Sequence, residues 1–124
     1  MFTISAVLLS SCQYRNEKEA EKSELEEARK EMISKFEELK NDIDERIEEI
    51  ENRMEGASDE LKEGLEDAKE ELLNKRSELE KAMDDVRDAT SETWDEVSAF
   101  AENTYSSVKE GVQDVIEDVE EWLE

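Results

Sequence analysis

The chain has 124 residues and a net charge of −23, from 39 acidic and 16 basic side chains, with one cysteine and no histidine. Such an acidic surface repels nucleic-acid phosphates, so we expect no nucleic-acid partner. The lack of histidine removes the commonest general base and the usual Cys/His zinc sites. We therefore expect a protein that is not an enzyme, with no catalytic residue, metal, cofactor or small-molecule substrate.

The first twelve residues differ from the rest because they carry no charge. The apolar run Phe2–Leu9 is far shorter than the roughly 20 residues that span a bilayer. Its length fits the apolar region of a signal peptide. It ends in Leu9-Ser10-Ser11-Cys12, which is an aliphatic residue, two small residues and the only cysteine.

This tetrapeptide resembles the processing signal of bacterial lipoproteins. The resemblance implies cleavage between Ser11 and Cys12, which removes residues 1–11 as a signal peptide, and fatty acylation (palmitate) of Cys12. Residues 12–24 then form an acylated, polar tether. Several acyl chains make a durable covalent membrane anchor. Gln13, in place of the aspartate that retains lipoproteins at the inner membrane, implies the outer membrane of the cell envelope, facing the periplasm.

Residues 1–4 lack the Lys or Arg with which such signals begin. Two interpretations therefore stay open. Either residues 1–11 are a signal peptide truncated at its start, or the match is accidental and the protein is cytoplasmic.

Residues 25–124 have the composition of an all-α protein. Charged residues make up 44% of the chain, which has only three glycines and no proline. Glu, Lys, Leu and Ala dominate long helices and coiled coils. From residue 25 the apolar positions follow steps of three and four that add to eleven, as in three helical turns: Leu25, Ala28, Met32, Phe36, Leu39, Ile43, Ile47, Ile50 and Met54.

The eleven-residue period is plainest near the C-terminus, where four adjacent rows make a wide apolar face. These rows are Val86, Val97, Val108 and Val119; Trp94, Tyr105 and Ile116; Thr90, Ala101, Val112 and Leu123; and Ala89, Phe100, Gly111 and Trp122. We expect six residues of this face to form a core or to contact a partner: Trp94, Val97, Phe100, Tyr105, Val108 and Trp122.

Two segments can interrupt the helical body. Residues 56–59 contain a glycine and good N-cap residues, and residues 89–93 are small and hydroxylated, with Thr93 and Glu96 spaced for a capping box. Breaks at both would give a three-helix bundle. The apolar register runs through both without a slip, which favours long helices in a coiled coil or an elongated hairpin with a reversal near residue 90. Such helices bury their stripe by self-association or against a helical partner.

Five acid–base pairs at i,i+4 are expected to support the helices. They are Glu26–Lys30, Glu31–Lys35, Asp42–Arg46, Glu49–Arg53 and Glu71–Lys75. We interpret these pairs as a solvated face.

The C-terminal half also carries the run Thr93-Trp94-Asp95-Glu96-Val97, with a second aromatic, Tyr105, eleven residues after Trp94. Residues 72–115 resemble small stress-related bacterial coiled-coil proteins, which have no established activity. We therefore expect a lipid-anchored helical envelope protein with a structural or protein-interaction role. The alternative is a soluble or peripheral amphipathic-helix protein that binds lipid surfaces or protects against desiccation, since the eleven-residue rhythm also resembles desiccation-protective proteins. Diffuse calcium binding by the acidic segments is a third and weaker hypothesis.

Overall fold

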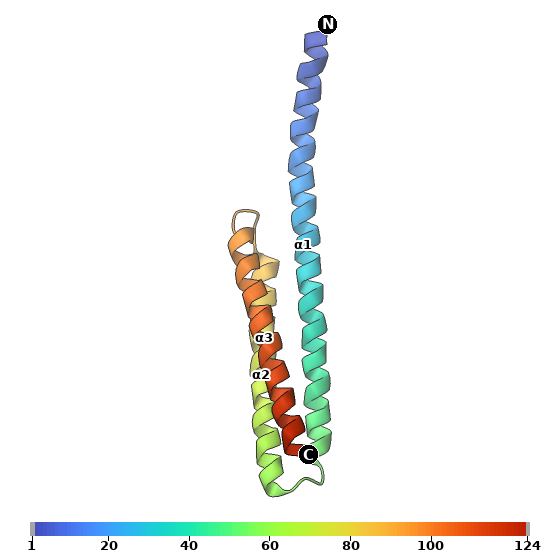
Figure 1. The fold of residues 1–124 in the computed structure, drawn as a ribbon. Helices are drawn as coiled ribbons and strands as arrows, with labels where there is room; N and C mark the ends of the chain where they lie inside the picture. Colours follow the sequence, from blue (N-terminus) through green and yellow to red (C-terminus); the bar gives the residue numbers. More distant parts are fainter. Residues whose placement is uncertain (1, 124) are drawn as a thin grey trace.

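The computed structural model contains three helices, α1 (Phe2–Met54), α2 (Asp59–Asp88) and α3 (Trp94–Leu123) (Figure 1). The structure describes the backbone of residues 2–123 and the side chains of residues 23–123. The prediction of an all-α fold is confirmed. Of the predicted arrangements, the chain adopts the three-helix bundle, with reversals near residues 56–59 and 89–93. The preference for a hairpin with one reversal near residue 90 is therefore wrong.

The first reversal lies between α1 and α2, and its geometry explains why an unbroken apolar register does not give an unbroken helix. Gly56 has φ +84°, a left-handed conformation that side chains disfavour. Ser58 is the N-cap of α2, and its Oγ accepts a hydrogen bond from the Leu61 N–H at 3.3 Å. Asp59 and Glu60 occupy the first turn of α2, where the helix dipole favours acids.

The second reversal is held by two threonines. Ala89, with ψ 138°, leaves the helical conformation and ends α2. The Thr93 hydroxyl accepts a hydrogen bond from the Thr90 N–H at 3.0 Å, and the Thr90 hydroxyl accepts one from the Thr93 N–H at 3.4 Å. The Thr93 side chain is thus directed back into the loop, in place of the capping box expected with Glu96.

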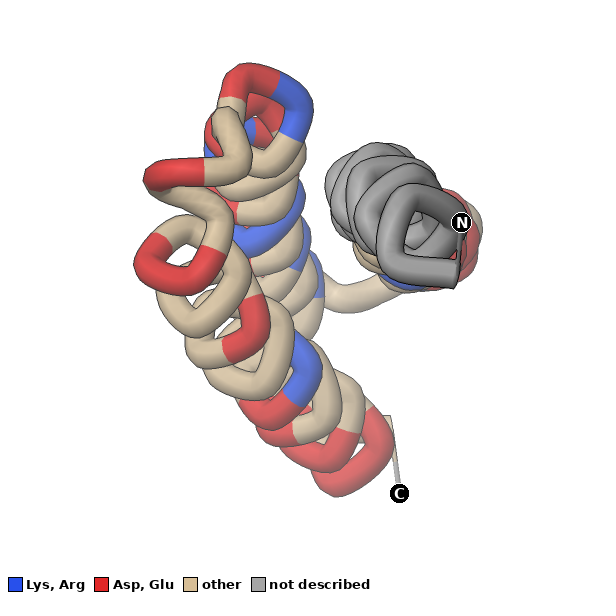
Figure 2. The backbone as a smooth tube through the Cα atoms, turned by 90° about the horizontal axis from the view of Figure 1, so that it is seen from above, with Lys and Arg blue, Asp and Glu red and all other residues tan. Residues whose placement is uncertain are grey.

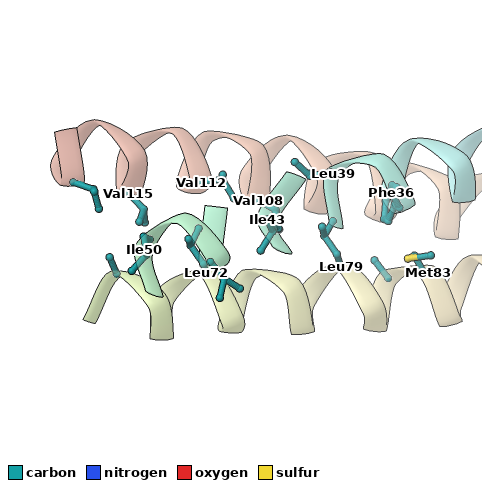
Figure 3. Close-up of a cluster of buried hydrophobic side chains, with 14 of the residues drawn as sticks. Phe36, Leu39, Ile43, Ile50, Leu72, Leu79, Met83, Val108, Val112 and Val115 are labelled. Carbon is teal, nitrogen blue, oxygen red and sulfur yellow. The ribbon is translucent and has the colours of Figure 1, made fainter. Parts of the chain in front are cut away.

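Helix α2 is the central element, because α1 and α3 each contact it extensively and contact one another far less. Its fully buried residues Leu65, Leu72, Leu79 and Val86 lie seven apart, the spacing of a coiled-coil seam. Figure 3 shows Leu72 and Leu79 of this seam among the buried side chains of both neighbours. The buried residues of the neighbours that surround it include Phe36, Leu39, Ile43 and Ile50 from α1 and Val108, Val112 and Val115 from α3.

Among residues 23–123, the ion pairs that link two helices join α1 to α2. None of the five expected i,i+4 pairs has its charged atoms within 4.0 Å. Four pairs join the two helices: Lys40–Glu80 at 3.3 Å, Lys69–Glu51 at 2.9 Å, Arg87–Glu37 at 3.9 Å, and Arg76–Asp44. The hydrogen bond to Asp44 raises the pKa of Arg76. Arg46 and Lys75 pair with Glu49 and Glu78 at i,i+3 instead of their expected partners. Each such exposed pair contributes about 0.2–1 kcal/mol.

Arg29 fastens α1 to the C-terminal end of α2. Its guanidinium donates hydrogen bonds to the carbonyl oxygens of Arg87, at 3.3 Å, and Ala89, at 2.6 Å. The last carbonyls of a helix have no partner within the helix and carry partial negative charge, so a cation is favourable there. Arg29 therefore marks the level along α1 at which the three-helix region begins.

We predict that Arg29→Ala lowers the free energy of unfolding by about 1–2 kcal/mol, because it removes charge-assisted hydrogen bonds to two helix-end carbonyls. Urea denaturation followed by circular dichroism measures the change. Lys30→Ala is the matched control: it removes the same charge from an exposed neighbour and should change stability by less than about 0.5 kcal/mol. Equal effects of the two substitutions would contradict the role given to Arg29.

Candidate functional site

The predicted lipidation site falls within the backbone of α1, but the side chains of Ser11 and Cys12 lie outside those that the structure describes. Acylation of Cys12 and cleavage before it therefore stay predictions. Among the described residues, no helix contains an apolar stretch long enough to cross a bilayer.

The six candidate core or partner-contact residues fall into three environments. Val108 is fully buried in the core. Trp94, Val97 and Tyr105 are half-buried and pack against it. Phe100 and Trp122 are the exposed large hydrophobic residues of the described chain, with 61% and 45% of their surface accessible. The structure thus separates four residues that stabilise the bundle from two that lie on its surface.

Tyr105 joins α3 to α1. Its ring stacks on Phe36 with centroids 5.5 Å apart and planes inclined by 29°, and Lys35 Nζ lies 4.2 Å from the Tyr105 centroid. Stacked aromatic rings and a cation over a ring face each stabilise a fold modestly. Tyr105 therefore has a structural role, in one of the few places where α1 and α3 meet.

The row that contains Phe100, Gly111 and Trp122 follows the flank of α3 beside α2. At one end the indole of Trp122 lies against Gly64 of α2, where an added Cβ would be 3.4 Å from the ring. In the middle, the Lys75 side chain covers Gly111. At the other end Phe100 stays exposed. Phe100 is therefore the more exposed of the two aromatic residues in this row.

Two adjoining hollows between α2 and α3 meet at Phe100. Their volumes are about 460 and 340 Å³, and both are lined by Asp85 and Phe100. We call this depression the Phe100 groove. Its remaining lining residues are Glu78, Lys81, Ala82 and Asp88 from α2, Ala89 and Thr93 from the loop, and Glu96, Val97, Asn103, Thr104 and Ser107 from α3.

The Phe100 groove has an apolar floor and acidic walls. Ala82 and Ala89 are buried beneath it. Asp85, Asp88 and Glu96 are exposed and take no part in the ion pairs found among the described residues. Figure 2 shows the wider setting: acidic segments recur along α3, which has Lys109 as its one base, whereas α2 carries both basic and acidic segments.

The rest of the described surface has no comparable combination of an exposed aromatic residue and unpaired acids. A hollow of about 140 Å³ between α1 and α3 is lined by Arg46, Arg53, Glu49 and Glu120 as well as apolar residues, so its charges are balanced. Within residues 23–123, no three His, Cys, Asp or Glu side chains are grouped so as to hold a metal ion.

The sequence pointed to Phe100 but not to the acids around it. Asp85 and Asp88 lie on α2 and Glu96 lies on α3, and only the reversal at residues 89–93 brings them to one groove. The eleven-residue rows were the available signal, because they placed Phe100 in a different row from Val108, but both rows belonged to one wide apolar face.

The chain was compared with protein-family models, with curated proteins and with solved structures, and none of the three comparisons gave a match.

We predict that Tyr105→Ala lowers the free energy of unfolding by about 2 kcal/mol, because it removes a ring that packs on the core. Phe100→Ala should change it by less than about 0.5 kcal/mol, since the ring is mostly exposed and Ala favours helix. Urea denaturation of the two variants tests the division between core and surface aromatics. A larger loss for Phe100→Ala than for Tyr105→Ala would contradict it.

Proposed function

We propose that the protein is a non-enzymatic, lipid-anchored envelope protein that presents a three-helix bundle for protein interaction. The observation that carries the proposal is the tetrapeptide Leu9-Ser10-Ser11-Cys12 at the junction between the uncharged start and the charged body. A processing signal has to lie at this junction, because the peptidase acts where an apolar segment meets the mature polar chain.

The lengths of the helices support an anchored arrangement. Helix α1 has 53 residues, whereas α2 and α3 have 30 each. The three-helix region begins near Arg29, which contacts the end of α2. A continuous helix from Cys12 to Arg29 spans about 25 Å at 1.5 Å per residue. In the proposal this part of α1 is a spacer that holds the bundle away from the bilayer.

Charge supports the same arrangement. The spacer from Cys12 to Arg29 has four bases against six acids, whereas residues 88–124 have one base, Lys109, against twelve acids. Anionic headgroups attract the basic side chains and repel the acidic ones. Anionic headgroups therefore repel α3 more strongly than the spacer, which fits a spacer near the membrane and an α3 held farther from it. The end of the bundle with residues 55–58 then lies farthest from the membrane.

The packing of α3 favours an interaction role over lipid-surface binding. A helix that binds a lipid surface inserts its apolar face into the headgroup region. In the closed bundle the apolar face of α3 is occupied, since Val108, Val112, Val115 and Val119 are buried. Lipid binding by α3 would require the bundle to open.

We predict that the full chain, expressed in a bacterium fed a clickable fatty acid, becomes labelled and that Cys12→Ala abolishes the label. Mass spectrometry of the mature protein should find Cys12 as its acylated first residue. Ser10→Ala, which keeps a small residue before the cleavage site, is the matched control and should retain the label. An unlabelled wild type, or a label that persists in Cys12→Ala, would contradict the anchor.

A further inference from the structure

We infer that the Phe100 groove is a docking site for a basic segment of a partner protein, one that places an apolar side chain on Phe100 and Lys or Arg side chains against Asp85, Asp88 and Glu96. The inference deepens the interaction role proposed above by naming the surface and the chemistry of its partner. It does not depend on the lipid anchor.

The apolar component of the site is Phe100. This residue has 61% of its surface exposed, in a helix whose other apolar rows pack into the bundle. The groove continues on both sides of the ring, because the two hollows share it. Exposed aromatic rings beside a depression are typical anchoring points in protein interfaces. A single aliphatic or aromatic side chain can enter either hollow and cover the ring.

The electrostatic component determines the partner's charge. Asp85 and Asp88 approach the groove from α2 and Glu96 approaches it from α3. None of the three is among the ion-paired acids of the described chain, so each is available to a cation from outside. Glu78 already contacts Lys75 at 3.8 Å, and Lys81 is the single base of the lining. Three free acids around an exposed ring complement a segment in which Lys or Arg flanks an apolar residue.

The same charges argue against a second copy of this chain as the occupant. The chain carries a net charge of −23. Among the described residues the other exposed large hydrophobic residue is Trp122, which borders a hollow that contains Glu60. Glu121 precedes Trp122 in the sequence, and Glu124 follows two positions later. Docking that indole on the Phe100 groove would bring acids against acids, which is unfavourable.

A suitable probe is an 18-residue amidated peptide of leucine and lysine, with the leucines on one helical face, labelled with fluorescein. Its binding to the full 124-residue chain is followed by fluorescence anisotropy at physiological salt. We expect saturable binding that Phe100→Ala weakens about tenfold, the loss typical of an anchoring aromatic. Trp122→Ala is the matched control, because it removes an exposed aromatic from the same helix away from the groove, and it should leave the affinity unchanged.

Charge-matched variants separate docking from attraction to the net charge. Asp85→Lys and Asp114→Lys change the net charge equally, and both residues are exposed, but only Asp85 lines the groove. We expect Asp85→Lys to weaken binding at least fivefold more than Asp114→Lys. Circular dichroism confirms that each variant is folded.

Three results would overturn the inference: no binding of the peptide, equal affinities of wild type and Phe100→Ala, or equal effects of Asp85→Lys and Asp114→Lys. Self-association of the full chain in sedimentation, abolished by Phe100→Ala, would also overturn it, in favour of a second copy. The fatty-acid labelling experiment is independent of the peptide-binding experiment. Absence of peptide binding would therefore not contradict the lipid anchor, and absence of the label would not contradict the docking site.

Discussion

The burial of the apolar seam of α2 between α1 and α3 is the constraint on which the rest of the structure depends. The chain is highly acidic, and its like charges oppose a compact state. Apolar burial therefore has to bring the helices together, and α2 supplies the shared surface through Leu65, Leu72, Leu79 and Val86. The ion pairs between α1 and α2 offset part of the repulsion, and Arg29 satisfies the end of α2.

This packing also decides what remains on the surface. Because α3 directs Val108, Val112 and Val115 into the core, its neighbouring row is displaced to the flank beside α2. There Trp122 lies against Gly64, Lys75 covers Gly111, and Phe100 stays exposed. The reversal at residues 89–93 brings Asp85 and Asp88 close to Glu96 around that ring. The proposed docking site thus follows from the way in which α3 packs on α2.

The helices themselves could be predicted from sequence, because their apolar periods are local and long. The reversals were harder, since an apolar stripe in register is compatible with a straight helix and with a folded one. What decides the first is the left-handed conformation of Gly56, and what decides the second is the pair Thr90 and Thr93. Both effects are short-range. They interrupt the continuous helix that the apolar register would allow, and the folded arrangement is stable because α1 and α3 both bury apolar surface against α2.

The details that sequence could not supply are those that depend on which helices lie side by side. The eleven-residue period identifies the residues that share a face of α3, but it does not say which part of that face another helix covers. Val108 and Phe100 were therefore both expected to lie in a core or at a partner contact. Arg76 reaches Asp44, a residue 32 positions away, and Arg46 and Lys75 pair with Glu49 and Glu78 rather than their i,i+4 partners. Of these, the Arg76–Asp44 pair depends on which helices lie side by side, whereas the i,i+3 pairs are alternatives within one helix.

Small-angle X-ray scattering of the full chain tests the central claim most directly, namely that one chain folds back twice and buries the seam of α2 between its own helices. The longest element is then α1 with 53 residues, so the account predicts a maximum dimension of about 80–90 Å at 1.5 Å per helical residue. A maximum dimension of about 150 Å or more, as an extended rod paired with another chain would give, would contradict it.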